Sequence, residues 1–218
     1  MKILFLLSLF GVLMFFDCSS NNQKQTVVNA EKTETSMENL PAHQNKVGDV
    51  EYTLSAKILK KNENHQSDVV QITYELKNTG DKNYLVYNRG HFGTNDSLVY
   101  VEPQKDGSIE ISQKAFREPT DRNCPQRFVA VVPNASWLKA RQTVNRQIEV
   151  ALPLTLKTPF DDCAPLPAMP AKIDRVRFCL GIAEADENQV KINDNGFVQG
   201  QQFVKEQQLL CSDNIPLK

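Results

Sequence analysis

The sequence lacks an excess of charge of either sign. Its 218 residues carry 25 basic and 26 acidic side chains, which gives a formal net charge of -1. The basic residues are scattered among the acidic ones and form no stripe that could neutralise several phosphates of a nucleic acid. We therefore expect no nucleic-acid partner.

The sequence also lacks the short motifs of common catalytic sites. It has no glycine-rich phosphate loop, no G-x-S-x-G elbow, no H-E-x-x-H helix and no C-x-x-C pair. Its three histidines, His43, His65 and His91, are far apart along the chain. We expect no catalytic centre, no metal site and no cofactor. Because catalytic groups can assemble across a fold, a metal site or base at His91 is kept as an alternative.

No apolar run is long enough to cross a membrane. The longest, residues 3–16, follows the positively charged start Met1-Lys2 and falls short of the ~20 apolar residues that a spanning helix needs. A short apolar run behind a positive start is typical of a secretory signal peptide. We therefore assign residues 1–17 to a signal peptide.

The residues behind this run, Phe15-Phe16-Asp17-Cys18-Ser19, resemble the signal of bacterial lipoproteins. In that family the cysteine after the apolar region becomes the lipidated first residue, although a small residue usually stands where this chain has Asp17. The resemblance implies acylation of Cys18 and anchoring in the bacterial cell envelope. Ser19 after the cysteine further implies transfer to the outer membrane. The alternative is an ordinary secretory signal that is cut elsewhere, with Cys18 unmodified.

The next segment is polar. Residues 19–48 contain no aromatic side chain and no repeated apolar period, so they cannot form a core. About 30 residues of flexible chain have a root-mean-square reach of ~30 Å, enough to hold a domain clear of a membrane. We assign residues 18–48 to a lipidated N-terminus and disordered linker, and residues 49–218 to one folded domain.

The folded part shows the period-two alternation of half-buried β-strands, and helical periodicity is nearly absent. Residues 69–77 and 84–87 are expected to pair as a hairpin across the turn at 78–83, which is rich in Asn, Gly and Asp. Further strands are expected at residues 50–58, 98–101, 109–111, 127–132, 144–154, 176–182 and 202–211. The proline-rich stretch 158–171 can form neither a helix nor a central strand.

Many short strands with turn residues between them are typical of an antiparallel sandwich. A long early hairpin, an excursion and a closing hairpin loosely resemble bacterial immunoglobulin-like domains across most of residues 49–212. The resemblance implies architecture only, an all-β immunoglobulin-like sandwich, since the cross-sheet Cys-Trp-Cys spacing of antibody domains is missing.

Four cysteines lie in the folded part, and in an exported chain they predict two disulfides. A hairpin turn centred on Asn195-Gly196 would place Cys179 and Cys211 opposite each other to within one residue, and a slightly longer loop would align them. Cys124 is then left to pair with Cys163. Two polar clusters, Asp161-Asp162 and residues 193–196, are better explained as a solvated loop and a hairpin turn than as cation sites.

Together these features favour a cell-envelope lipoprotein that is not an enzyme. We expect the sandwich to act as a binding or structural module whose loops contact another envelope protein or a glycan. One alternative is a protease inhibitor that presents the proline-rich stretch around Cys163. A less favoured alternative is a metal-binding protein or enzyme that uses His91.

Overall fold

The structure of the chain, a computed structural model, describes residues 43–61, 66–89, 98–125 and 134–217. Their regular structure is β, apart from one 3₁₀ turn, η1 (Gln201–Phe203). The signal-peptide residues, Cys18, His65, His91 and the strand expected at 127–132 lie outside these ranges. The strands are β1 (His43–Val47), β2 (Val50–Leu59), β3 (Val69–Asn78), β4 (Tyr84–Val86), β5 (Tyr100–Pro103), β6 (Ile109–Gln113), β7 (Ser136–Leu138), β8 (Thr143–Ala151), β9 (Arg175–Glu184), β10 (Lys191–Ile192), β11 (Val198–Gln199), β12 (Gln208–Cys211) and β13 (Ile215–Pro216).

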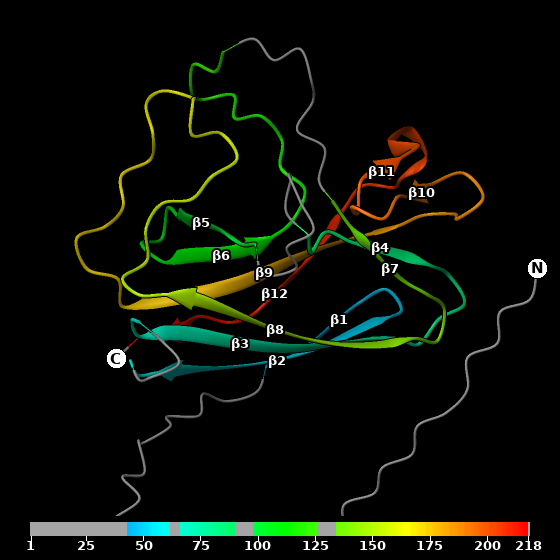
Figure 1. Cartoon of the computed structure of the whole chain (residues 1–218), viewed down its shortest axis with the longest axis horizontal. Coiled ribbons are helices and arrows are strands. Elements are labelled where there is room, and N and C mark those ends of the chain that lie inside the picture. The colour runs from blue at the N-terminus through cyan, green and yellow to red at the C-terminus, as the bar shows by residue number, and fades with distance from the viewer. Residues whose placement is uncertain (1–42, 62–65, 90–97, 126–133, 218) are drawn as a thin grey trace, which may run out of the picture. The chain divides into compact units, whose positions relative to one another are not determined.

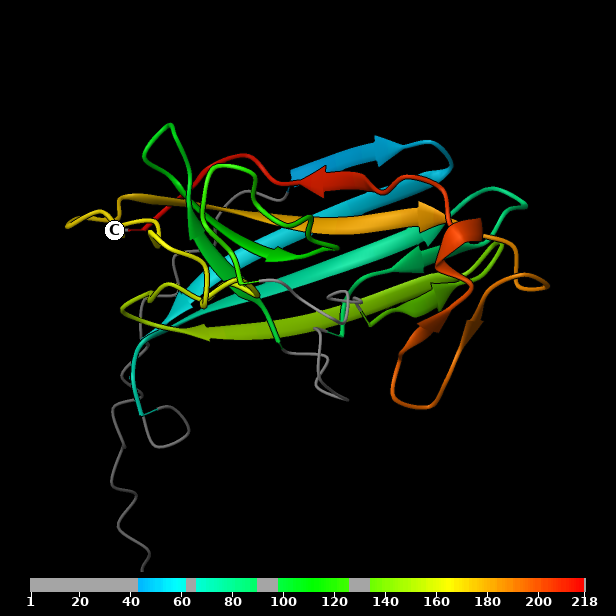
Figure 2. The same ribbon diagram turned by 90° about the horizontal axis from the view of Figure 1, so that it is seen from above.

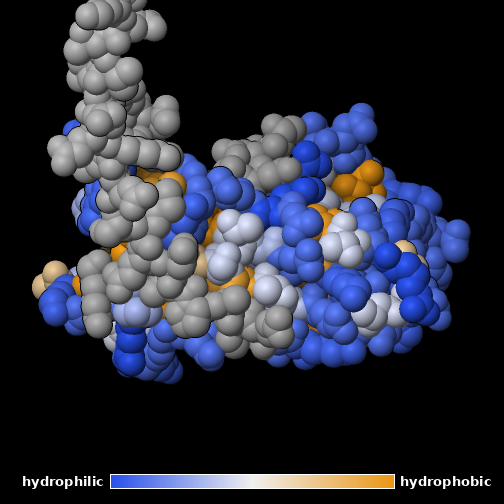
Figure 3. Space-filling view, turned by 90° about the horizontal axis from the view of Figure 1, so that it is seen from below, coloured by the Kyte–Doolittle hydropathy of each residue, from blue (hydrophilic) through white to orange (hydrophobic). Residues whose placement is uncertain are grey.

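Four strands form the lower layer in Figure 1, an antiparallel sheet in the order β1-β2-β3-β8. The alternation read in the sequence decides its two faces, because every second side chain of a strand points the same way. Tyr52, Ile72 and Ile148 point inward and are buried. Thr73 and Gln147, which are next to Ile72 and Ile148 in the sequence, are exposed. Where grey atoms do not cover it, the surface seen from below is mostly hydrophilic (Figure 3).

The second sheet is built around β9. β12 pairs with residues 179–182 of β9 along one edge. β6 pairs with residues 176–180 and β4 with residues 182–184, and both ranges overlap that of β12, so these two strands follow one another along the other edge. β5 extends the sheet beyond β6, β7 extends it beyond β4, and β13 continues the β12 edge. The β6–β9 pair is parallel, which the antiparallel expectation missed, because β6 reaches β9 through the long connection that contains the proline-rich stretch.

Apolar side chains fill the space between the two sheets. Tyr52, Tyr74 and Phe178 form a row across it, with ring centroids 6.3 Å and 5.7 Å apart. The Tyr74 hydroxyl donates to Oε1 of buried Gln113 at 3.3 Å. Seen from above, the long strands of both sheets run in broadly the same direction, as in an aligned sandwich (Figure 2).

The strand order is that of an immunoglobulin-like Greek key. β2-β3-β8 in one sheet and β4-β9-β12 in the other occupy the places of strands A-B-E and C-F-G, in the same chain order. The β5–β6 pair is inserted between the third and fourth of these strands. The expected all-β sandwich is therefore confirmed. Both sheets, both disulfides and the core lie within residues 43–217, so this part of the chain has a core of its own.

The hairpin expected at residues 69–88 is wrong. β3 pairs with β2 on one edge and β8 on the other, so it has no edge left for β4, which pairs with β7 and β9 in the second sheet. The turn between them crosses from one layer to the other. Asn78 holds this turn, since its side-chain amide donates to the carbonyl oxygens of Lys82 and Lys139 and its Oδ1 accepts from Gly80.

Strand β1 lies within the segment expected to be linker. It pairs with β2 across the two-residue loop Gly48-Asp49, with Val47 opposite Val50 and Gly48 at a φ of 57°. A Gly-Asp loop is a known hairpin signal. The alternation rule missed the strand because His43–Val47 contains one apolar side chain in five. The last strand was expected at residues 202–211, but only residues 208–211 form a strand, β12, and the 3₁₀ turn η1 precedes it.

Candidate functional site

The two disulfides join the expected cysteines. Cys124 pairs with Cys163, and Cys179 pairs with Cys211 at directly opposite positions of β9 and β12. The β10–β11 hairpin explains the alignment, because Ile192 pairs with Val198 across the five residues 193–197 and not across the expected two-residue loop. Lys191 pairs with Gln199, so a single register centred on Asn195 runs through β10–β11 and β9–β12.

The turn at residues 193–197 accounts for its own polar residues. Asn193 Oδ1 accepts the backbone N–H groups of Asn195 (3.0 Å) and Phe197 (2.9 Å), and Gly196 takes a φ of 84° that favours glycine. Asp161 and Asp162 are exposed on the proline-rich loop. Within the described ranges no group of three or more potential metal ligands comes together.

Two pieces of chain cover the outer face of the second sheet (Figure 1). We call residues 114–125 and 155–172, linked by Cys124–Cys163, the braced loops. They lie over β5 and β6, where Phe116 packs edge-on against Tyr100 at 4.7 Å and against Phe160 at 6.4 Å. The excursion, residues 185–207, covers the other end, where Val190 and Val198 pack with Leu85 and Ala183.

Between the braced loops and the excursion lies an open cleft of about 440 Å³, which we call the central cleft. It is lined by Tyr87, Lys114, Ala115, Phe116, Arg117, Glu206, Gln207 and Leu209. Leu209 is directly opposite Gly181 of β9 and keeps 43% of its surface exposed. The cleft therefore has wall residues from the end of β4 (Tyr87 follows it directly), from the segment after β6, and from β12 and the segment that enters it.

Gly181 and Gln207 position the walls of the central cleft. The Gln207 side chain accepts from the Ala115 N–H at 3.0 Å and donates to the Ala115 carbonyl oxygen at 2.6 Å, so it replaces a strand partner. A Cβ at Gly181 would lie 2.5 Å from Gln207 Oε1 and 3.0 Å from Lys114 Cα. Glycine is therefore required where these segments cross β9.

A buried carboxylate holds the positive side of the central cleft. Glu110 is 3% exposed and accepts from Arg177 Nη2 at 2.7 Å and Nε at 3.1 Å, and it also pairs with Lys114. Lys114 Nζ in turn lies 5.0 Å from the centre of the Phe116 ring, within cation–π range. The fixed ammonium and ring form one wall.

The mouth of the central cleft is more loosely held. Arg117 and Glu206 pair at 2.6 Å, but their side chains are 85% and 77% exposed. Burial raises the pKa of Tyr87, so its phenol keeps its proton at physiological pH. The cleft thus offers aromatic and aliphatic surface, hydrogen-bonding groups and both signs of charge. That mixture suits a polar ligand with apolar faces, such as a glycan or an extended peptide.

Sequence reasoning did not find the central cleft. The signal that could have found it is Gly181, a glycine inside an otherwise apolar strand, which indicates close approach of another segment. The structure places Cys124–Cys163 on the braced loops and Cys179–Cys211 across β9 and β12, and neither pair lines the cleft. His43 lies on β1, and the other two histidines lie outside the described residues.

Comparison with known proteins finds no matching family model, no similar curated protein and no similar solved structure. In the part of the chain that the structure describes, no helix is long and apolar enough to cross a membrane.

Proposed function

We propose that this chain is a bacterial cell-envelope lipoprotein whose sandwich binds an envelope protein or a glycan at the central cleft and catalyses no reaction. The observation that carries the binding role is the cleft itself, in which Glu110 holds Lys114 and Tyr100 packs against Phe116, while Arg117 and Leu209 stay accessible. The anchor rests on the placement of Cys18 behind the apolar run and before a polar linker.

Acylation tests the anchor. Metabolic labelling with a palmitate analogue is expected to mark the wild-type protein and to leave the Cys18→Ala variant unlabelled. Mass spectrometry of the mature protein is expected to find an acylated first residue at Cys18, and fractionation is expected to place it in the outer membrane. An unmodified N-terminus downstream of Cys18 would contradict the anchor.

Binding at the central cleft is tested with a soluble chain of residues 19–218. Cross-linking to envelope extract and binding to glycan arrays are expected to give a partner that Leu209→Asp and Arg117→Glu lose about tenfold or more in affinity. Leu166→Asp is the matched control, since Leu166 is 46% exposed on the braced loops and does not line the cleft. Equal affinity of all variants would place the partner elsewhere.

A second function, protease inhibition, is favoured by one specific feature of the braced loops. Exposed Leu166 lies three residues after Cys163, and Ala164 is tied to Asn123 by two backbone hydrogen bonds of 2.8 and 2.9 Å. A braced segment that presents an exposed side chain is the arrangement that an inhibitor needs. Inhibition of proteases with an apolar specificity pocket, lost in Leu166→Asp and kept in Leu209→Asp, would establish it.

A metal-binding or enzymatic role for His91 is the weakest proposal. A measured turnover or bound metal that His91→Ala abolishes, with the circular dichroism spectrum unchanged, would establish this role and refute the non-enzymatic one.

A further inference from the structure

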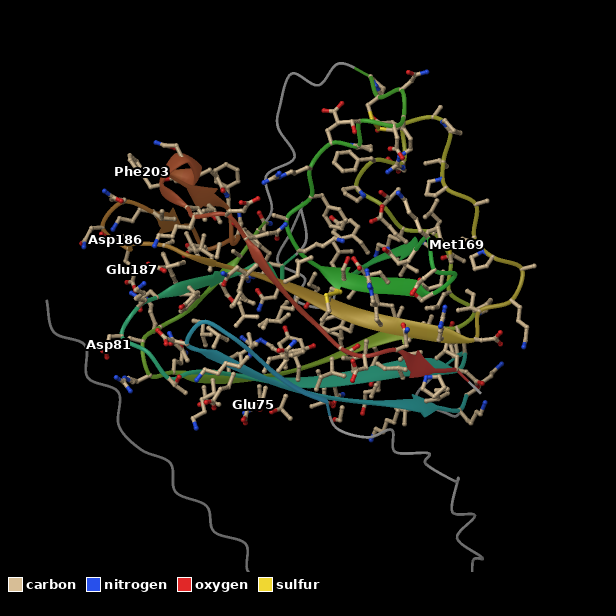
Figure 4. All side chains as sticks on the ribbon, turned by 180° about the vertical axis from the view of Figure 1, so that it is seen from behind. Glu75, Asp81, Met169, Asp186, Glu187 and Phe203 are labelled. Carbon is tan, nitrogen blue, oxygen red and sulfur yellow. A yellow bond between two sulfur atoms is a disulfide. The ribbon has the colours of Figure 1, made fainter. Side chains whose placement is uncertain are left out.

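A second depression, of about 540 Å³, lies at the end of the sandwich away from the β3–β4 turn. We call it the end groove. It is lined by Ile58, Lys60, Leu152, Pro153, Leu154, Pro170, Ala171, Lys172, Ile173 and Leu217. Figure 4 shows Met169, which precedes the groove residues Pro170 to Ile173, at the end of the molecule opposite Asp81, Asp186 and Glu187. Its volume falls in the ~300–1,000 Å³ range of small-ligand sites.

The lining of the end groove is chemically simple. Eight of the ten residues carry aliphatic side chains or proline rings, and the remaining two are lysines. Among the residues that the structure describes, the lining contains no carboxylate, hydroxyl or side-chain amide. The apolar residues favour binding of an apolar chain, and the two lysines favour binding of an anion. The lining provides no neutral polar side chain that could orient a neutral polar ligand.

Backbone groups at the two ends of the groove already have partners. Leu152 N–H donates to the Asp68 carbonyl oxygen at 2.8 Å, and Leu217 N–H donates to that of Asp174 at 2.8 Å. A peptide laid in the groove would have to bury its own backbone N–H and C=O groups without these partners, which is costly. A hydrocarbon chain has no such groups, so the groove favours an acyl chain over a peptide.

The two lysines lie at the exposed rim. Lys60 Nζ pairs with Asp68 at 3.0 Å and Lys172 Nζ with Asp174 at 2.7 Å, and neither aspartate lines the groove. Exposed ion pairs of this kind contribute little to stability. An ammonium group has three N–H donors, so each lysine can bind an added anion while it keeps its aspartate.

We propose that the end groove binds a single-chain anionic amphiphile, with the chain against Leu152, Leu154 and Leu217 and the anionic head group between Lys60 and Lys172. The shared chemistry is an acyl or alkyl chain that ends in a carboxylate or a phosphate. This site is separate from the central cleft and requires neither the anchor nor the partner of the proposed function.

The probe is laurate, kept below its micelle-forming concentration and titrated calorimetrically into residues 19–218. Saturable binding with one site per chain is expected. Leu217 is partly buried and packs against the edge of the core near the C-terminus, and Leu217→Asp is expected to weaken binding at least about tenfold while the circular dichroism spectrum stays that of the folded domain. The matched control Leu166→Asp places the same charge on an exposed leucine outside the groove and is expected to change nothing.

The head group is tested separately. Lys60→Gln with Lys172→Gln is expected to weaken laurate and dodecyl phosphate about tenfold and to leave dodecanol unchanged, whereas Lys77→Gln with Lys105→Gln, outside the groove, has no effect. The preferred anion distinguishes a fatty acid from a single-chain phospholipid as the source.

Several results would overturn the proposal: no saturable binding of laurate, equal binding by Leu217→Asp, dodecanol binding as tightly as laurate, or an apolar peptide displacing laurate at lower concentration. Failure of the central cleft to bind a partner would leave these measurements unaffected, because Leu209→Asp does not change the end groove.

Discussion

Glu110 is a carboxylate buried on the side of β6 that faces away from the main core. Its register partner on β5, Glu102, is also acidic and cannot balance its charge. The cations of Arg177 and Lys114 stabilise that charge instead. Removing one member of such a cluster leaves the others without a counter-charge in a poorly hydrated place. The residue therefore matters to both the sheet and the wall of the central cleft.

We expect Glu110→Gln to lower the free energy of unfolding by about 2 kcal/mol, the usual loss for a hydrogen bond to a charged group with its counter-ion. Urea denaturation of residues 19–218 measures it. The control is Glu118→Gln, on an exposed residue of the braced loops, which should stay within about 0.5 kcal/mol. Equal losses in the two variants would show that the cluster contributes nothing.

Glu184 gives the fold a pH dependence. Lys205 Nζ at 2.9 Å and Lys82 Nζ at 3.1 Å hold the pKa of this carboxyl below its usual range. A lowered folded-state pKa stabilises the fold above the unfolded value of about 4.3, and the contribution is lost as the pH falls through the folded value. We expect Glu184→Gln to cost about 0.5 kcal/mol at pH 7 and nothing near pH 2. A constant difference at both values would contradict the linkage.

At the scale of the elements, the crossing of β9 by two chain segments depends on one amide. We expect Gln207→Leu to lower the free energy of unfolding by about 1–2 kcal/mol, because it leaves the N–H and C=O of Ala115 without their partner. The Ala115 amide should then exchange its hydrogen faster in NMR. Gln202→Leu, an exposed glutamine of η1, is the control, and unchanged exchange at Ala115 would refute the contact.

Alternation of apolar and polar residues was enough to predict most strands. β2, β3 and β8 each have one buried face and one more exposed face, and β9 is buried along most of its length. It could not predict partners. β3 and β4 are adjacent in sequence and look like a hairpin, yet β8 occupies the edge that β4 would need. Pairing depends on which edges long-range partners have already taken, and local pattern does not contain that information.

The disulfides and the central cleft also differ in whether the sequence alone could predict them. The Cys179–Cys211 pair was predictable because a turn signal at Asn195-Gly196 fixes register through the chain between them. The central cleft was not, because Tyr87, Phe116 and Leu209 come from three distant segments that the fold brings together. Gly181 was the one local sequence signal that other segments approach β9 closely at this point.

For the whole domain, the two disulfides have different roles. Each closes a loop of 39 or 32 residues, for which loop-closure entropy gives roughly 3.5–4 kcal/mol. That is a large share of a typical stability of ~5–15 kcal/mol. Cys179–Cys211 crosses two paired strands, whereas Cys124–Cys163 joins loops that lie on the sheet.

We therefore expect the double change Cys124→Ala with Cys163→Ala to expose residues 114–125 and 155–172 to protease while the circular dichroism of the sandwich persists. The double change Cys179→Ala with Cys211→Ala should instead lower the unfolding midpoint of the whole domain. Limited proteolysis with mass spectrometry distinguishes the two. Identical cleavage patterns would contradict the division of roles.

The common centre of register at Asn195 has a consequence for how this chain can change in length. Because Lys205 N–H donates to the Glu184 carbonyl oxygen at 3.1 Å, the excursion leaves and re-enters the sheet at neighbouring points. Residues can be added at positions 194 and 195 of the 193–197 tip without displacing Cys211 from Cys179. Val190 and Val198 must stay, since they cover Leu85 and Ala183. Asp194 and Asn195 are exposed, whereas Gly196 accepts a hydrogen bond from the Ala135 N–H and Phe197 pairs with Asn134. Positions 194 and 195 are thus where an inserted domain or epitope would be tolerated.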